Sequence, residues 1–251
     1  MVTLNEFCRY LDTLLQPSLV SDYCPNGIQI EGKPEIKRFA TAVSASLQTI
    51  EAAIRLEVDA LIVHHGLFWN GDSPIIIGAK KQKIEQLLSK GVSLLAYHLP
   101  LDLHRDFGNN WKAARDLGWD CLQPFWVYKG IPVGVKGTFP KQSRTAVQRQ
   151  LETYYGHTAQ CAFGGPEHVS SGALISGGAF KQLLDAAAEG VDCFITGSFD
   201  EPAWNQSFEE RVNFFALGHT ATERVGPMAL GEHLEKNFHL EYHFIDTPNP
   251  F

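Results

Sequence analysis

The sequence predicts an α/β protein built from two similar halves. Short apolar runs alternate with segments of helical periodicity, which is the pattern of strands joined by helices. The order of strand, helix and strand also occurs twice, because Val58-Asp-Ala-Leu-Ile and Val191-Asp-Cys-Phe-Ile lie at equivalent places in two similar runs. Two such units can resemble each other by chance, but we favour an internal duplication.

The start of the chain predicts a helix followed by two strands. Thr3 and Glu6 form a capping box, and apolar residues follow at helical spacing: Leu4, Phe7, Leu11, Leu14 and Leu15. A short strand is expected over 28–30, and a second one over 39–43 after the turn Gly32-Lys33-Pro34.

A parallel pair of strands is expected next. Ser46 can cap a helix over 47–56, which leads into an apolar strand over 60–63. A helix that joins two strands in this way predicts a parallel, right-handed connection. Another helix and strand then end at His98, and the corresponding strand of the second half ends at His219.

The middle and the end of the chain suggest where the domains divide. The stretch 121–171 is rich in proline and glycine and predicts one helix, over 144–154. A helix is expected over 228–237 and a strand over 240–245, which could pair with either half. We expect one lobe from 1–123 with part of 200–251, and a second from 124–199, with a possible exchange of the C-terminal strand.

Composition narrows the class of protein. A chain of 251 residues can bury a core without disulfides or a structural metal, and its five cysteines contain no Cys-x-x-Cys pair. No stretch approaches the roughly 20 apolar residues of a membrane-spanning helix, and the N-terminus does not resemble a targeting signal. We therefore expect a soluble cytoplasmic protein. The net charge of −7 and the lack of a Lys/Arg cluster disfavour nucleic-acid binding.

Two adjacent histidines follow the buried strand over 60–63, in the motif His64-His65-Gly66. In open α/β sheets ligands bind beyond the carboxyl ends of the strands, and imidazole is the commonest protein ligand of metals. The alternative is a pair of surface histidines in a loop, so other residues must distinguish the two interpretations.

Two more histidines, each with a carboxylate four residues later, end the corresponding strands. His219 and Glu223 share one face where the chain turns helical. Pro100 disfavours a helical conformation at the residue before it, so we expect a turn from His98 to Asp102. We favour Asp102 as a metal ligand and regard His98 and His104 as supporting groups or proton carriers.

These residues together suggest a centre with two metal ions. Adjacent histidines on an extended chain point to opposite sides, which suits two ions about 3.5–4 Å apart. The expected ligands are His64, His65, Asp102, His219 and Glu223. Bridging by Glu223 leaves room for a shared water, whose pKa can reach about 7, so hydroxide becomes the nucleophile of a hydrolase. Zinc, manganese, iron, cobalt and nickel all fit such ligands.

The electrostatics of this centre favour an anionic substrate. Two divalent ions, the two carboxylates and one hydroxide leave a net charge of about +1. Phe68 and Trp69 follow the histidine pair, either as packing residues or as an apolar wall for a heterocycle. We expect surface or capping roles for the remaining histidines: His157, His168, His233, His239 and His243.

Nearly the whole chain resembles the GTP cyclohydrolase 1 type 2 homologues, also called NIF-three-like proteins. The resemblance rests on the following motifs: Pro25-Asn-Gly-Ile-Gln29, Val63-His-His-Gly66, His98-Leu-Pro-Leu-Asp-Leu-His104, Gly108-Asn-Asn110, Ile195-Thr-Gly197 and Gly218-His219 with Glu223. It implies two intertwined three-layer α/β/α domains and a dinuclear metal site on the same five residues. It also implies a toroidal homohexamer, assembled as a trimer of dimers, and GTP ring opening.

The chain departs from the pattern of these relatives at two positions. Ser198 stands where the family often has glutamate, and Asp200 or Glu201 could replace that acidic group near the substrate. Ser44 stands where many relatives have aspartate, and the sequence assigns it no role.

Three functions are compatible with these observations. The first is a metal-dependent hydrolase of a nucleotide or a related heterocycle. The second is a ring-shaped metal-binding scaffold without turnover. The third is a protein that handles nucleic acid or damaged nucleotides, which the acidic charge disfavours.

Overall fold

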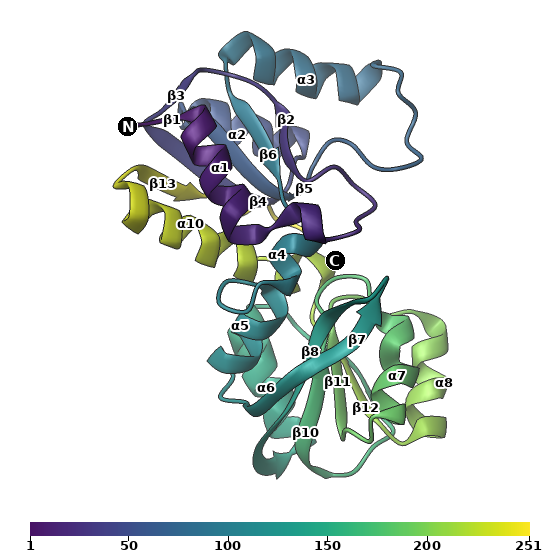
Figure 1. Ribbon diagram of the computed structural model, residues 1–251. Helices are drawn as coiled ribbons and strands as arrows, with labels where there is room; N and C mark the ends of the chain where they lie inside the picture. Colours follow the sequence, from purple (N-terminus) through teal and green to yellow (C-terminus); the bar gives the residue numbers. More distant parts are fainter. The chain divides into compact units, whose positions relative to one another are not determined.

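The computed structural model describes residues 1–251 and divides the chain into two compact units (Figure 1). Unit 1 comprises Met1–Phe107 and Gly226–Pro248, and unit 2 comprises Gly108–Val225 and Asn249–Phe251. Each unit is therefore assembled from two separate stretches of chain. The two-domain α/β fold expected from the sequence is confirmed.

Unit 1 contains a mixed five-stranded sheet. Four strands are parallel neighbours and the last one, β2, is antiparallel to β6. The sheet order is β13 (Glu241–Phe244), β4 (Arg38–Ser44), β5 (Ala60–His65), β6 (Ser93–Ala96) and β2 (Gly27–Ile30), and β1 (Val2–Thr3) pairs separately with β3 (Glu35–Ile36). The C-terminal strand thus joins the first unit, beside β4.

Helices cover both faces of this sheet. They are α1 (Leu4–Leu15), α2 (Leu47–Arg55), α3 (Gly78–Lys90), α4 (Leu99–Leu103) and α10 (Val225–Phe238), with a 3₁₀ turn at Pro17–Leu19. Because neighbouring strand residues point to opposite faces, Phe39 packs with residues of α1 and α10, whereas Ala40 packs with residues of α2 and α3. Unit 1 is therefore a three-layer α/β/α sandwich.

The expected caps fix where the first two of these helices begin. Thr3 Oγ1 accepts a hydrogen bond from the Glu6 amide at 3.2 Å, and Ser46 Oγ accepts one from the Thr49 amide at 3.0 Å. Each bond satisfies an amide that has no partner inside its helix. The predicted helices and the parallel pairing of β4 with β5 are confirmed.

Unit 2 contains a mixed six-stranded sheet with a parallel centre. Strand β10 is parallel to β11 and β11 to β12, while the outer pairs are antiparallel. The order is β7 (Asp120–Tyr128), β8 (Ile131–Ser143), β10 (His168–Leu174), β11 (Cys193–Thr196), β12 (Asn213–Ala216) and β9 (Gln160–Phe163). The central triplet repeats the β4, β5, β6 arrangement of unit 1.

Helices also lie on both faces of the second sheet (Figure 1). They are α5 (Asn109–Asp116), α6 (Arg144–Tyr155), α7 (Leu183–Ala188), α8 (Glu201–Glu210) and α9 (His219–Thr222), with a 3₁₀ turn at Phe180–Gln182. Side chains of α5 and α6 pack with Ile195 and Phe215, in a cluster that contains no residue of α7 or α8. The latter helices contact β11 and β12.

Hydrogen bonds at the start of the central strands are equivalent in the two units. Asp59 Oδ2 accepts from the amides of Lys37 and Arg38, and Asp192 Oδ2 accepts from two consecutive amides at the start of β10. The carbonyl of each aspartate also accepts from the next parallel strand, at 2.9 Å in both cases. This agreement in detail supports the internal duplication.

A pH-dependent loss of stability is expected when Asp59 is replaced by asparagine. Burial raises the pKa of Asp59, but hydrogen bonds from the Lys37 amide, the Lys33 ammonium and the Arg38 amide lower it overall. A carboxylate whose folded pKa is depressed stabilises the protein above its unfolded pKa, about 3.9, and loses that effect as pH falls through the folded pKa. Asp59→Asn should therefore unfold more easily at pH 7, and chemical denaturation should show the difference shrinking below about pH 4. A difference of constant size down to pH 2 would contradict this account.

The units divide at Phe107 and Gly108, whereas the sequence suggested residues 123 and 124, which fall inside β7. The reason is α5, whose Trp111, Ala113 and Ala114 belong to the core of unit 2.

None of the helices combines the length and the apolar character that crossing a membrane requires.

Candidate metal-binding residues

His64 lies at the carboxyl end of β5, with its side chain completely buried. Its Nδ1 lies 3.2 Å from the carbonyl oxygen of Tyr97, which can only accept a hydrogen bond. The proton is therefore on Nδ1, and Nε2 carries the lone pair. A backbone acceptor of this kind commonly orients a metal-binding histidine.

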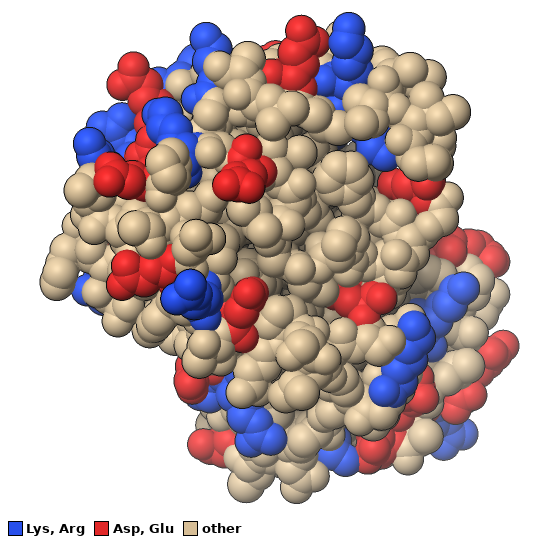
Figure 2. Space-filling model, turned by 45° about the horizontal axis from the view of Figure 1, so that its top comes forward, with Lys and Arg blue, Asp and Glu red and all other residues tan.

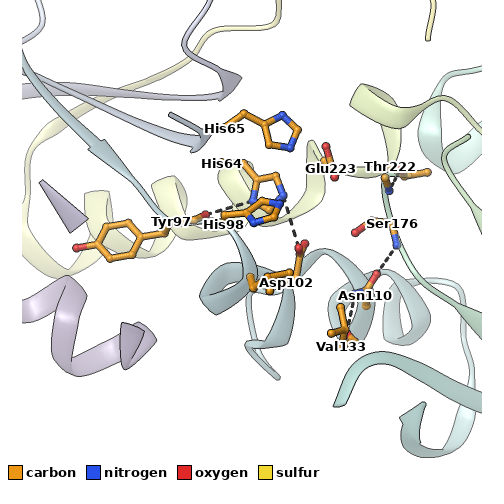
Figure 3. A network of polar contacts seen from close by, with 12 residues as sticks. His64, His65, Tyr97, His98, Asp102, Asn110, Val133, Ser176, Thr222 and Glu223 are labelled. Carbon is orange, nitrogen blue, oxygen red and sulfur yellow. Dashed lines mark hydrogen bonds and ion pairs between the residues drawn. The ribbon is translucent and has the colours of Figure 1, made fainter. Parts of the chain in front are cut away.

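Asp102 in α4 provides a carboxylate close to this lone pair. Its Oδ2 lies 3.6 Å from His64 Nε2, and its side chain is 7% exposed (Figure 3). Two atoms about 2.1 Å from one ion and at a tetrahedral angle lie about 3.4 Å apart. The spacing of His64 and Asp102 therefore fits two ligands of one metal ion.

His65 ends β5 and is partly exposed. Its ring centre lies 4.7 Å from that of His64, so the rings approach each other instead of pointing to opposite sides as the sequence suggested. The alternation of an extended strand sets the direction of the Cβ atoms, and rotation about the side-chain bonds at the strand end still lets the rings converge. Ser44 Oγ lies 3.0 Å from His65 Nδ1, which gives Ser44 a contact that sequence reasoning missed.

His98 completes a group of three imidazoles in unit 1 (Figure 3). One nitrogen from each of His64, His65 and His98 lies within 4.8 Å of the others. Trp69 packs edge-on against His98, with ring centres 5.2 Å apart, and Tyr23 does the same at 5.0 Å. Trp69 also lies beside His65, with ring centres 5.7 Å apart, so it contacts two of the three histidines.

The segment after His98 is helical, so the turn expected from Pro100 is wrong. Leu99 begins α4 and Pro100 is its second residue, where a missing amide hydrogen does not break the helix. The Leu99 amide donates to Asp22 Oδ2 at 3.0 Å, so a residue 77 positions earlier caps this helix. This long-range cap outweighs the local preference of a residue before proline.

Asp22, Cys24 and His98 form another group that could hold a metal ion, but hydrogen bonds already engage its carboxylate. Burial raises the pKa of Asp22, and bonds from His98, Asn26 and the Leu99 amide overcome this and lower it to about 2. Burial raises the pKa of the Cys24 thiol, and the negative charge of Asp22 raises it further. A protonated thiol and a fully bonded carboxylate are poor metal ligands.

The second histidine–carboxylate pair lies in unit 2. His219 begins the short helix α9 and Glu223 follows its end, so the two side chains share a face. His219 Nε2 lies 3.2 Å from Glu223 Oε2, and the glutamate side chain is 5% exposed. This pair also has the spacing of two ligands on one ion.

Gly177 makes room for this pair. A Cβ at this position would lie 2.2 Å from Glu223 Oε1 and 3.2 Å from His219 Nε2, and the backbone φ is +68°. The Gly177 amide donates to Thr222 Oγ1 at 3.0 Å, which fixes the loop against α9. Only glycine satisfies both the space and the backbone conformation.

The acidic candidates near Ser198 have different positions. Ser198 Oγ lies 3.4 Å from His219 Nδ1, whereas Asp200 caps α8 through the Glu201 amide, and the Glu201 side chain is exposed in the first turn. A pocket of about 410 Å³ opens beside Ser198, lined also by Phe199 and Gly218. Ser198 is thus the residue of this segment that contacts a candidate ligand.

The remaining predicted residues have local contacts. His104 follows α4 directly, and its Nδ1 accepts from the amides of Asp106 and Phe107. Phe68 packs against the core of unit 1 with Lys80 over its ring. The structure therefore associates His98 and Trp69, but not these two residues, with the imidazole group.

Besides Ser44, sequence reasoning missed three residues that support the candidate ligands. They are Asp22, Gln29, whose Oε1 accepts from the Leu67 amide just after the histidine pair, and Gly177. Gln29 lies in a motif that carried the family resemblance, and Gly177 lies in a repeated segment, so a sequence pattern marked both residues. No sequence pattern marked Asp22, because its partners are distant in sequence.

The fold and these clusters define a class of protein: a two-domain α/β protein whose histidine, aspartate and glutamate clusters could bind metal ions. The family model described as Duf34/NIF3 (NGG1p interacting factor 3) matches residues 2–250. This chain belongs to that family, as the resemblance implied.

Similar proteins cover the full chain. A Chlamydia pneumoniae protein named GTP cyclohydrolase 1 type 2 homolog is 48% identical, with 100% of both chains covered, and an Escherichia coli protein of the same name is 38% identical over 98% of each. A solved structure from Thermus thermophilus is 36% identical with a TM-score of 0.92 and covers 100% of both chains.

Proposed function

We propose that this protein is a dinuclear-metal-dependent hydrolase of a nucleotide or a related heterocycle. The observation that supports it best is the presence of two histidine–carboxylate pairs with buried carboxylates, His64 with Asp102 and His219 with Glu223, at 3.6 and 3.2 Å. The proposed ligands are these four residues and His65. These residues would hold two divalent ions, with Glu223 as the ligand that both ions share.

Bound divalent ions would supply Lewis acidity and make water more acidic near neutral pH. The residues of the chain have separate tasks. The Tyr97 carbonyl keeps the lone pair of His64 on Nε2, and Ser44 and Ser198 contact the Nδ1 atoms of His65 and His219. Two ions exceed the charge of two carboxylates, so an anionic group of the substrate is attracted. Zinc, manganese, iron, cobalt and nickel remain candidates.

The substrate class follows from the surroundings of the pairs and from the relatives. Trp69 beside His98 offers an aromatic wall, and the pocket beside Ser198 has room for a nucleobase. Several relatives are named GTP cyclohydrolase 1 type 2 homolog, which favours a purine nucleotide. We assign proton transfer to His98 in preference to His104, and substrate contact to Trp69 in preference to Phe68 and Glu201.

Asp102→Ala should reduce the metal content and the hydrolysis of nucleotides together. In the proposed scheme Asp102 serves one of the two ions, so about one ion per chain should remain. Turnover should fall at least about 100-fold, because replacing even a residue that only contacts a metal ligand typically lowers metal affinity or activity by 10–100-fold. The measurement is product release from a panel of nucleotides by metal-loaded protein, with elemental analysis of the same samples.

Asp72→Ala is the matched control, because this aspartate is exposed and lies in the same unit. It should keep both the metal and the activity. Full turnover by the Asp102→Ala protein would exclude the mechanism, and no turnover of any nucleotide by the wild-type protein would exclude the substrate class.

A metal-binding scaffold is the second candidate, favoured by exposed apolar side chains. Ile75, Ile76 and Ile77 are 62%, 51% and 68% exposed, and Trp204 is 50% exposed. Such surfaces mark contacts with other chains, and they fit the homohexamer, a toroidal trimer of dimers, that we also propose. Partner binding that survives Asp102→Ala, in a protein without turnover, would favour the scaffold. Light scattering tests the hexamer.

Handling of nucleic acid has less support. On the face in Figure 2, acidic and basic side chains are interspersed, and no continuous basic patch is visible. The net charge is −7. Salt-sensitive binding to single-stranded nucleic acid would support this function.

All five cysteines are free thiols, which fits the proposed cytoplasmic location.

A further inference from the structure

Asp22 is a carboxylate that is almost completely buried, because its side chain is 2% exposed. Oδ1 accepts from the Tyr23 amide at 2.7 Å and lies 3.0 Å from His98 Nδ1. Oδ2 accepts from the Leu99 amide and from Asn26 Nδ2, both at 3.0 Å. Three of these four partners can only donate, which is the environment of an ionised carboxylate whose oxygens accept.

The carboxylate determines which nitrogen of His98 carries a proton. Because Asp22 Oδ1 can only accept, His98 Nδ1 must be the donor, and Nε2 keeps the lone pair in the neutral ring. The His98 ring centre lies 4.8 Å from that of His64 and 5.6 Å from that of His65. Because Nδ1 is bonded to Asp22, Nε2 is the His98 atom that remains available beside His64 and His65.

The same carboxylate positions a second candidate residue. Its bond to the Leu99 amide caps α4, and α4 carries Asp102. Asn26 reinforces this arrangement, since its Oδ1 accepts from the His98 amide at 2.8 Å. One buried side chain thus connects the 22–26 segment to both His98 and Asp102.

We propose that Asp22 is a positioning residue that fixes the Nδ1-protonated form of His98 and anchors the helix that carries Asp102. This inference rests on the proposed function for its purpose, but its geometry involves unit 1 alone. Carboxylate–histidine pairs of this kind set the tautomer and the orientation of the ring. Asp22 therefore acts through His98 and Asp102 and needs no contact with substrate.

Asp22→Asn tests this inference, because asparagine has one acceptor oxygen where aspartate has two. An amide NH₂ in the Oδ2 position would face the Leu99 amide and Asn26 Nδ2, which are both donors. The NH₂ should instead occupy the Oδ1 position, where only the Tyr23 amide opposes it and His98 can respond by moving its proton to Nε2. We expect the tautomer of His98 to invert.

The tautomer is read from ¹⁵N chemical shifts of the metal-free full chain at a pH where histidine is neutral. Wild-type His98 should be protonated on Nδ1, and the Asp22→Asn protein should be protonated on Nε2. Titration with Zn²⁺ should show about 10–100-fold weaker binding by the variant. Protonation of wild-type His98 on Nε2 would overturn the inference without need of any variant.

Asp59→Asn is the matched control. Asp59 also accepts two backbone amides and lies at the opposite end of β5, one residue before the strand begins. It should lose stability without changing the His98 tautomer or the Zn²⁺ affinity. Equal losses of affinity in both variants would reduce Asp22 to a structural role. Loss of Zn²⁺ binding in Asp102→Ala with normal binding in Asp22→Asn would overturn the inference and leave the proposed function intact.

Discussion

Glu223→Ala is expected to remove both metal ions and to abolish hydrolysis, the largest loss of activity that we predict. Glu223 is the proposed bridging ligand, and its buried carboxylate lies 3.2 Å from His219 Nε2. Without it, both ions would lose a ligand, and a typical catalytic zinc site has three protein ligands. Binding of Zn²⁺ should weaken by more than about 100-fold, given the 10–100-fold effect of residues one contact further away.

The bridging role separates this variant from the other substitutions. Elemental analysis should show about two ions per wild-type chain, about one in Asp102→Ala and none in Glu223→Ala. Glu223→Gln keeps the volume of the side chain and should behave like Glu223→Ala, which excludes a cavity as the cause. Glu209→Ala, at an exposed position of α8, should resemble the wild type. Retention of two ions by Glu223→Gln would refute the bridge.

Gly177→Ala is expected to displace the side chains of Glu223 and His219 and to destabilise unit 2. The new Cβ would lie 2.2 Å from Glu223 Oε1, where real contacts do not occur, at a backbone φ of +68°. The conformation alone costs about 1–2 kcal/mol for a residue with a Cβ, and overpacking adds about 1–3 kcal/mol. The free energy of unfolding should fall by the sum, and Zn²⁺ binding should weaken.

Gly190→Ala separates the two contributions. Gly190 has nearly the same φ, +71°, but no atom lies within 4 Å of a Cβ placed there. Its alanine variant should lose only the conformational part and should bind Zn²⁺ like the wild type. Equal effects of the two substitutions on stability and on metal affinity would show that Gly177 does not shape the space around Glu223.

Much of the fold could be predicted because its signals are local. Thr3 and Ser46 cap the helices that follow them, and apolar runs mark β5, which ends at His65, and β6, which ends at Ala96 shortly before His98. The resemblance of the 58–62 and 191–195 segments was visible in the sequence, and Asp59 and Asp192 make equivalent hydrogen bonds. Local patterns were less informative about the division at Phe107, because it depends on which core Trp111 joins.

The positions of the candidate ligands at strand ends could be predicted, but the contacts that support them could not. His64 and His219 follow apolar strands, so their position at a strand end is a local property. Asp22 reaches Leu99 across 77 residues and reverses the local effect of Pro100, which no spacing rule anticipates. Gly177 matters because of a side chain in another element, so its role depends on packing that only the folded chain reveals.

The central claim, a centre of two metal ions, is tested most directly by the metal content of the full-length protein purified without chelators. Elemental analysis against protein concentration should give about two divalent ions per chain, and Glu223→Gln prepared in parallel should give none. A wild-type protein that holds no divalent ion, and that binds none when Zn²⁺ or Mn²⁺ is added, would contradict the account.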